Sequence, residues 1–259
     1  MTETFRPAVI RGVEFGPGRP KICVPLTGST VEELRDGVAA LDGSFVDLVE
    51  LRADHFDDVD DIDEVLRATE TVRESLPDEI PLLFTFRSKP EGGQRDIDPV
   101  AYERLLLTTV RSGAIDAVDV EMFTELASLE RLVNGAHERG VAVIMSSHDF
   151  QHTPPLEQIV ARLRLQQDLG ADIVKIAVMP EAPSDVLTLL QATGVFAEKA
   201  TRPAMTMSMG PLGVVTRLAG ETFGSCATFG SVGEASAPGQ VEARSLRVTL
   251  DLLHDAQVG

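Results

Sequence analysis

The chain has 259 residues, enough for a large α/β core, and its formal net charge of −18 disfavours partners such as nucleic acid and anionic membranes. The N-terminus lacks the apolar segment of a signal peptide, and no apolar run is long enough to cross a bilayer, so we expect a soluble, cytoplasmic protein. Cys23 and Cys226 lie in strand-like runs and are expected to be free, buried thiols.

The first half of the chain predicts a hairpin followed by alternating strands and helices. Residues 8–14 and the turn 16–18 favour a short hairpin, which makes residues 1–19 an extension ahead of the main repeat. Strands are predicted over 21–26, 47–52, 81–87 and 117–121, and the helices that follow them over 29–40, 62–75, 99–112 and 126–139.

The second half continues the alternation. Strands are predicted over 141–147, 172–178, 204–208 and 227–231, with helices over 156–169, 184–193, 212–219 and 240–254. Eight strands alternating with eight helices predict a single (β/α)8 TIM barrel over residues 1–259, with the hairpin closing its bottom. A doubly wound open sheet is the alternative, but no glycine-rich nucleotide turn follows the first strand.

Lys175 lies in the apolar run from Ala171 to Val178, which predicts a buried parallel strand. Because side chains alternate across a strand, Lys175 shares a face with Ile173 and Ala177. A buried ammonium loses hydration, so this amine is either paired in a wet site or partly neutral and therefore nucleophilic. A purely structural lysine, which snorkels from the strand end or pairs with a buried acid, is the alternative.

Polar side chains collect at the carboxyl ends of the predicted strands, where a TIM barrel carries its active site. They are Glu50, Arg52, Asp54, Thr85, Arg87, Asp119, Glu121, Ser146 and His148. The strand of His148 neighbours that of Lys175, so this imidazole is the candidate general base for an imine-forming amine. Arg52, Arg87 and Arg217 would supply cations for a carboxylate, because no phosphate-binding loop is present.

A metal site is not expected. His148 and His152 have the spacing of metal ligands, but Pro154 and Pro155 argue against the helix that would aim both side chains at one ion.

Six motifs, in order and in spacing, closely resemble those of type I 3-dehydroquinate dehydratase, namely residues 50–56, 84–93, 146–150, 172–178, 206–210 and 235–240. The resemblance implies a lyase of the shikimate pathway of aromatic amino-acid biosynthesis that needs no cofactor. Lys175 would form a Schiff base with the ketone of 3-dehydroquinate, and His148 would act as general acid and base in a syn loss of water. Glu91 would orient His148. The substrate would be bound by Glu50, Arg52, Arg87, Arg217, Ser236 and Gln240, the last two from a loop that closes over the ligand. The family is commonly dimeric, which implies a homodimer.

Two positions depart from the family pattern. Pro25 stands where some members carry a serine that contacts the substrate, and the segment from Asp119 to Phe123 matches loosely, which leaves open whether Glu121 contributes. Two other functions also remain open from the residues alone. A class I aldolase uses a barrel lysine in the same electronic way but would need a phosphate or aldehyde site. A catalytically silent barrel would bind without turnover, although a lysine, a histidine and an arginine at such a site cost stability when no chemistry requires them.

Overall fold

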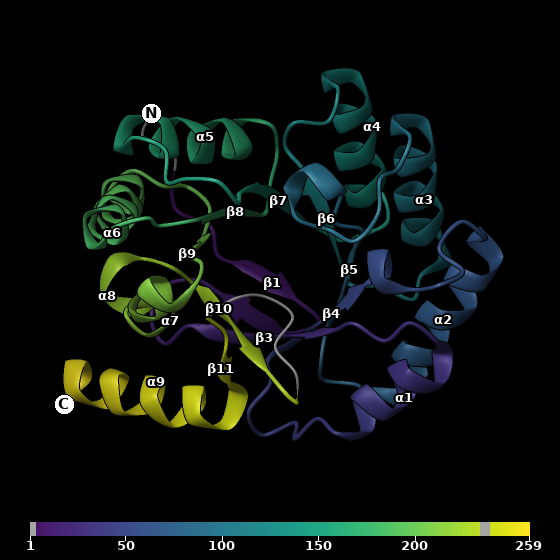
Figure 1. Cartoon of the computed structure of the whole chain (residues 1–259), viewed down its shortest axis with the longest axis horizontal. Helices are drawn as coiled ribbons and strands as arrows, with labels where there is room; N and C mark the ends of the chain where they lie inside the picture. Colours follow the sequence, from purple (N-terminus) through teal and green to yellow (C-terminus); the bar gives the residue numbers. More distant parts are fainter. Residues whose placement is uncertain (1–3, 234–238) are drawn as a thin grey trace.

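The computed structural model describes residues 4–233 and 239–259, and over these residues a parallel sheet curls into a barrel (Figure 1). The order of strands is β11-β10-β3-β4-β5-β6-β7-β8-β9. Their bounds are β3 (Lys21–Leu26), β4 (Leu48–Arg52), β5 (Leu82–Thr85), β6 (Ala117–Glu121), β7 (Ala142–Asp149), β8 (Ile173–Val178), β9 (Ala204–Ser208), β10 (Ala227–Ser231) and β11 (Val241–Glu242). The ends of the sheet meet where Ala204 of β9 bridges to Ser225, just before β10. The predicted barrel class is confirmed.

Helices cover the outside of the strands (Figure 1). The long ones are α1 (Val31–Ala39), α2 (Ile62–Ser75), α3 (Pro99–Ser112), α4 (Leu126–His137), α5 (Leu156–Asp168), α6 (Pro183–Ala197) and α9 (Ala243–Val258). Several begin where the sequence supplies a cap, because the Thr30, Asp61 and Asp98 side chains accept backbone N–H groups of the first turn. Across the described residues, none of these helices has both the length and the apolar character needed to cross a membrane.

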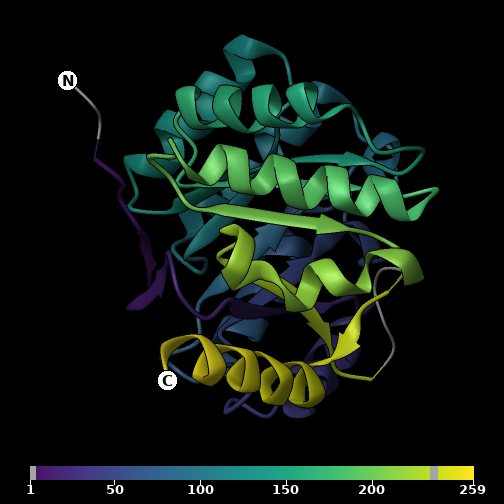
Figure 2. The same ribbon diagram turned by 90° about the vertical axis from the view of Figure 1, so that its left-hand side faces the viewer.

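The N-terminal hairpin fills the bottom of the barrel, as predicted. Strands β1 (Ala8–Ile10) and β2 (Val13–Phe15) pair in antiparallel fashion. Ile10 and Phe15 are buried in the same apolar cluster as the inward-facing Leu48, Ile144 and Ile173. In Figure 2 the hairpin, in purple, lies at the end of the barrel away from the arrowheads of the strands. The carboxyl ends of the strands therefore remain open to a ligand.

Two predicted helices are wrong in detail. Residues 212–219 do not form one helix but the short turns η3 (Pro211–Gly213), α7 (Val214–Leu218) and α8 (Gly220–Phe223). Gly213 lies so close to the Ser208 carbonyl that an added Cβ would be 2.1 Å from its oxygen, so the chain turns tightly there. The last helix begins at Ala243 rather than 240, because residues 241–242 pair with β10 and the Glu242 side chain caps the helix.

Candidate active site

A pocket of about 170 Å³ lies at the carboxyl ends of the strands, and it brings together side chains that are far apart in the sequence. Of the residues selected from the sequence, those that line it are Glu50, Arg52, Arg87, Glu91, His148, Lys175, Arg217 and Gln240. Ser236 lies outside the described residues. Pro25 is not among the described residues that line the pocket.

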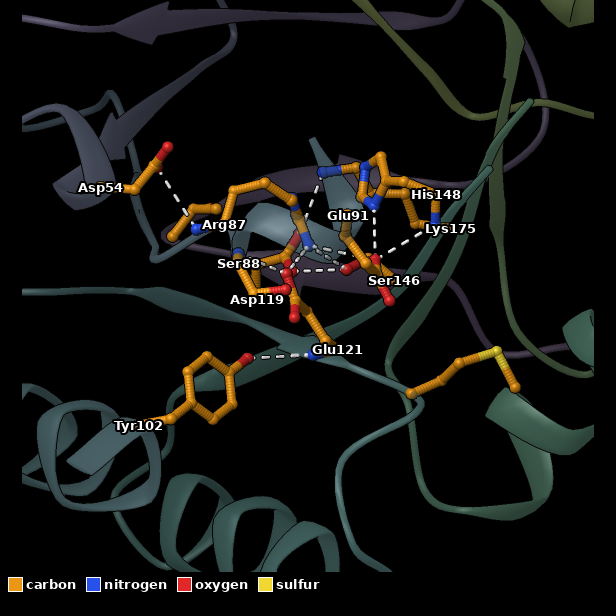
Figure 3. Close-up of polar contacts among 12 residues, drawn as sticks. Asp54, Arg87, Ser88, Glu91, Tyr102, Asp119, Glu121, Ser146, His148 and Lys175 are labelled. Atoms are coloured by element: carbon orange, nitrogen blue, oxygen red, sulfur yellow. Dashed lines mark hydrogen bonds and ion pairs between the residues drawn. The ribbon is translucent and has the colours of Figure 1, made fainter. Parts of the chain in front are cut away.

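Lys175 extends from β8 into this pocket and is only 3% exposed. Its Nζ lies 3.0 Å from the Asp119 carboxylate (Figure 3). The same atom lies 3.7 Å from the Glu50 carboxylate and above the Phe229 ring. The side chain of Gln166 holds the Lys175 backbone, accepting its N–H at 2.9 Å and donating to its carbonyl at 3.0 Å. The Lys175 amine is therefore paired with two carboxylates, and the Lys175 backbone is held by Gln166.

Buried charged side chains form a network next to the Lys175 amine (Figure 3). Asp119 accepts hydrogen bonds from Lys175 and, at 2.6 Å, from Ser146, and lies 2.8 Å from Arg87 Nη2. Burial alone would raise the pKa of Asp119, but Arg87 and Lys175 outweigh it and lower that pKa to about 2. Asp119 is therefore an ionised partner that orients the amine, and its carboxylate is a poor proton acceptor at neutral pH.

Arg87 is held by several acids at once. Its Nη1 donates to Glu121 at 2.8 Å and to Ser146 at 2.9 Å, and lies 3.5 Å from Glu91. Burial opposes its charge, yet Asp119, Glu121 and Glu91 together raise the pKa of Arg87 above its ordinary value. Glu121, whose contribution the sequence left open, thus anchors this guanidinium.

His148 ends on the neighbouring strand β7 and is oriented by Glu91. The Nδ1 of His148 lies 2.9 Å from the Glu91 carboxylate, which also accepts the His148 backbone N–H at 3.1 Å. Burial, reinforced by the positive charges of Arg87 and Lys175, lowers the pKa of His148 well below 6.5. Burial also raises the pKa of Glu91 to about 8, despite the nearby Arg87, so burial disfavours the charged form of each partner in the His148–Glu91 pair. With Nδ1 on Glu91, the neutral ring has Nε2 available as a base.

Two further groups flank the pocket. Arg217 comes from the short helix α7, and burial lowers its pKa to about 10, which still leaves it protonated at neutral pH. Gln240 reaches the pocket because Gly239 lies against the Gly210 backbone, where an added Cβ would meet the Gly210 oxygen at 2.3 Å. Gly239 also has a φ of +77°, which glycine adopts without strain.

Some contributors were missed by the sequence reasoning. Gln166 falls within the helix predicted over 156–169, and the signal that could have identified it is an amide at a buried helix position. Phe150, Met207, Met209 and Phe229 also line the pocket, and apolar residue types carry no signal of that role. Over the described part of the chain, no group of three or more His, Cys, Asp or Glu side chains is arranged to hold a metal ion.

Comparison with known proteins gives one consistent family. Residues 22–257 match the model of the type I 3-dehydroquinase family. A 3-dehydroquinate dehydratase of Listeria monocytogenes is 50% identical over 246 residues, which cover 95% of this chain and 97% of the relative. One of Syntrophotalea carbinolica is 53% identical with the same coverage. The crystal structure of a type I 3-dehydroquinate dehydratase from Clostridium difficile with covalently modified comenic acid matches with a TM-score of 0.95 at 43% identity, over 98% of this chain and 100% of that one.

Proposed function

The chain belongs to the type I 3-dehydroquinase family and has its 3-dehydroquinate dehydratase activity in the shikimate pathway, and we propose that Lys175 and His148 carry out the dehydration through an imine. The observation that supports these roles is the shared pocket, in which a buried amine, a neutral imidazole and the guanidinium of Arg217 face one ligand-sized space. The family match removes the aldolase and the silent scaffold as alternatives.

In the first step the Lys175 amine, once deprotonated, attacks the ketone carbon of 3-dehydroquinate. The resulting carbinolamine takes up on its hydroxyl group the proton that the ammonium gave up. It then loses this group as water and becomes a protonated imine, which withdraws electrons from the neighbouring carbon. Asp119 and Glu50 flank the Lys175 Nζ, so they stabilise the positive nitrogen of this imine as they do the ammonium.

In the second step His148 Nε2 takes a proton from the carbon next to the imine, and the electron pair forms an enamine. The imidazolium returns that proton to the hydroxyl group that leaves, which departs as water on the same face. Water then hydrolyses the conjugated imine, releasing 3-dehydroshikimate and the free amine. Glu91 keeps the ring in position and favours the tautomer with Nδ1–H.

For substrate binding, we assign the carboxylate to Arg217 and the hydroxyl groups to Glu50, Arg52 and Arg87. Arg217 is buried and cationic at neutral pH, as a carboxylate ligand should be. Gln240 lines the same pocket, and with Ser236 it would contribute from the loop that closes over the ligand and excludes water from the imine.

Reductive trapping tests the nucleophile. Borohydride added together with 3-dehydroquinate should reduce the imine and leave a stable adduct on the peptide that contains Lys175, located by mass spectrometry. The Lys175→Met variant and a sample without substrate are the controls. An adduct on another residue would refute the assignment of Lys175.

We also propose a homodimer located in the cytoplasm. Large apolar side chains are exposed on α9, namely Val248, Leu252 and Val258, and would suit a subunit contact. Cys23 and Cys226 are free and buried, as in proteins of a reducing compartment. Sedimentation equilibrium of the wild type and of Leu252→Glu tests the dimer, since a monomeric wild type would contradict it.

A further inference from the structure

Asp54 is a fully buried carboxylate behind the pocket that the proposed reaction does not use. It lies in η1 (Ala53–His55), directly after β4, and it is not among the described residues that line the pocket. Its Oδ1 accepts from Arg52 Nε at 2.9 Å and from the Arg87 backbone N–H at 3.3 Å. Its Oδ2 accepts from Arg52 Nη2 at 2.8 Å and from the Gln94 backbone N–H at 3.1 Å. Each carboxylate oxygen of Asp54 thus accepts two hydrogen bonds.

These contacts join two arms of the site. The first arm is the Arg52 guanidinium, which Asp54 holds through two parallel hydrogen bonds, a geometry that fixes its plane. The second arm is the segment from Arg87 to Gln94, which Asp54 binds at both ends, as Figure 3 shows for Arg87. Both arms line the pocket, yet the first lies at the end of β4 and the second follows β5.

The second arm is tightly folded and carries Glu91. The Ser88 carbonyl accepts the N–H groups of Glu91 at 3.0 Å and Gly93 at 2.9 Å. Gly93 is so close to the Arg87 carbonyl that an added Cβ would lie 1.8 Å from its oxygen. Because the segment is compact, fixing its two ends fixes Glu91, and through Glu91 the imidazole of His148.

We propose that Asp54 is a positioning residue. It holds Arg52 and the segment that carries Glu91 in fixed positions relative to each other, as substrate binding and proton transfer require. Four donors converge on it, and a carboxylate has enough lone pairs to accept from all of them. An asparagine would turn an NH2 group toward some of these donors and lose the paired contact with Arg52. The inference rests on the roles proposed above for Arg52 and Glu91.

The test is a double-mutant cycle with steady-state kinetics. Asp54→Asn should lower kcat/KM about ten- to a hundredfold, with a clear rise in KM, the range for removing a partner that orients a site residue. In an Arg52→Ala background the same change should cost markedly less, because the Arg52 arm is already absent. A merely structural Asp54 would give independent effects that multiply.

Asp116→Asn is the matched control. Asp116 likewise accepts a backbone N–H, from Leu82 at 2.8 Å, and binds Arg11 at 3.0 Å and Arg73 at 3.2 Å, but it lies at the amino ends of the strands. This variant should lose stability and keep the wild-type KM. An unchanged KM in Asp54→Asn would overturn the inference, as would a KM rise of the same size in Asp116→Asn.

Two further outcomes separate the proposals. An unchanged KM in Arg52→Ala would refute the substrate role of Arg52 and this inference with it, whereas a KM rise in Arg52→Ala but not in Asp54→Asn would refute the inference alone.

Hydrogen exchange of the unmodified protein gives a test that needs no variant. Gln94 is exposed, so its amide hydrogen should exchange slowly only because Asp54 accepts it. Exchange at the rate of a free loop amide would overturn the inference.

Discussion

Lys175→Met should abolish turnover and also destabilise the fold, because the ammonium partners a carboxylate that stays buried. Asp119 is 0% exposed and shares two cations, Lys175 and Arg87. The pKa of Asp119 falls from 3.8 to about 2, a net effect of roughly 2 kcal/mol in which its partners outweigh the cost of burial. Loss of one charged hydrogen bond, with Arg87 retained, should therefore lower the free energy of unfolding by about 1–3 kcal/mol.

Urea unfolding at several pH values measures this effect. Since the pKa of Asp119 is lower in the folded protein than its ordinary value, its stabilisation is present above pH 3.8 and is lost as the pH falls toward about 2. The gap between wild type and Lys175→Met should narrow over that window. Adding Asp119→Asn to Lys175→Met should recover stability, since it removes the uncompensated charge. A Lys175→Met protein as stable as wild type at pH 7 would refute the reasoning about this ion pair.

Three other changes test the remaining groups. Because burial and the neighbouring cations lower the pKa of His148, the acid limb of kcat/KM should lie below pH 6.5, and an acid limb above pH 7 would contradict this. His148→Ala should reduce kcat by about two to four orders of magnitude, while borohydride should still trap the imine. Arg217→Ala should raise KM by about ten- to a hundredfold through loss of a charged hydrogen bond, and an unchanged KM would remove it from the carboxylate role. Gly93→Ala should destabilise the protein and impair turnover, because the added Cβ has no space. Gly194→Ala, whose Cβ would meet no atom within 4 Å, should leave stability and turnover intact. Thermal unfolding and activity assays measure the two effects.

Local pattern was sufficient wherever a residue's neighbours in sequence set its environment. The strand around Lys175, the caps Thr30, Asp61 and Asp98, and the hairpin were predictable because alternation and capping act over a few residues. The helix expected over 212–219 failed because Gly213 packs against Ser208, a close approach that helical periodicity does not report. Gln166 was missed for the same reason, since its partner is the Lys175 backbone on the next strand.

The sequence by itself determined the barrel, the family to which the chain belongs, and which side chains sit at the carboxyl ends of the strands, because these follow from periodicity and motif order. Only the tertiary structure decided the charge state around them. Whether Lys175 is bare or paired depends on Asp119, which lies 56 residues away. Whether Arg87 faces the ligand alone or is held by Glu121, 34 residues away, likewise depends on tertiary contacts. Electrostatic energies depend on distance and burial, and only the folded chain sets both.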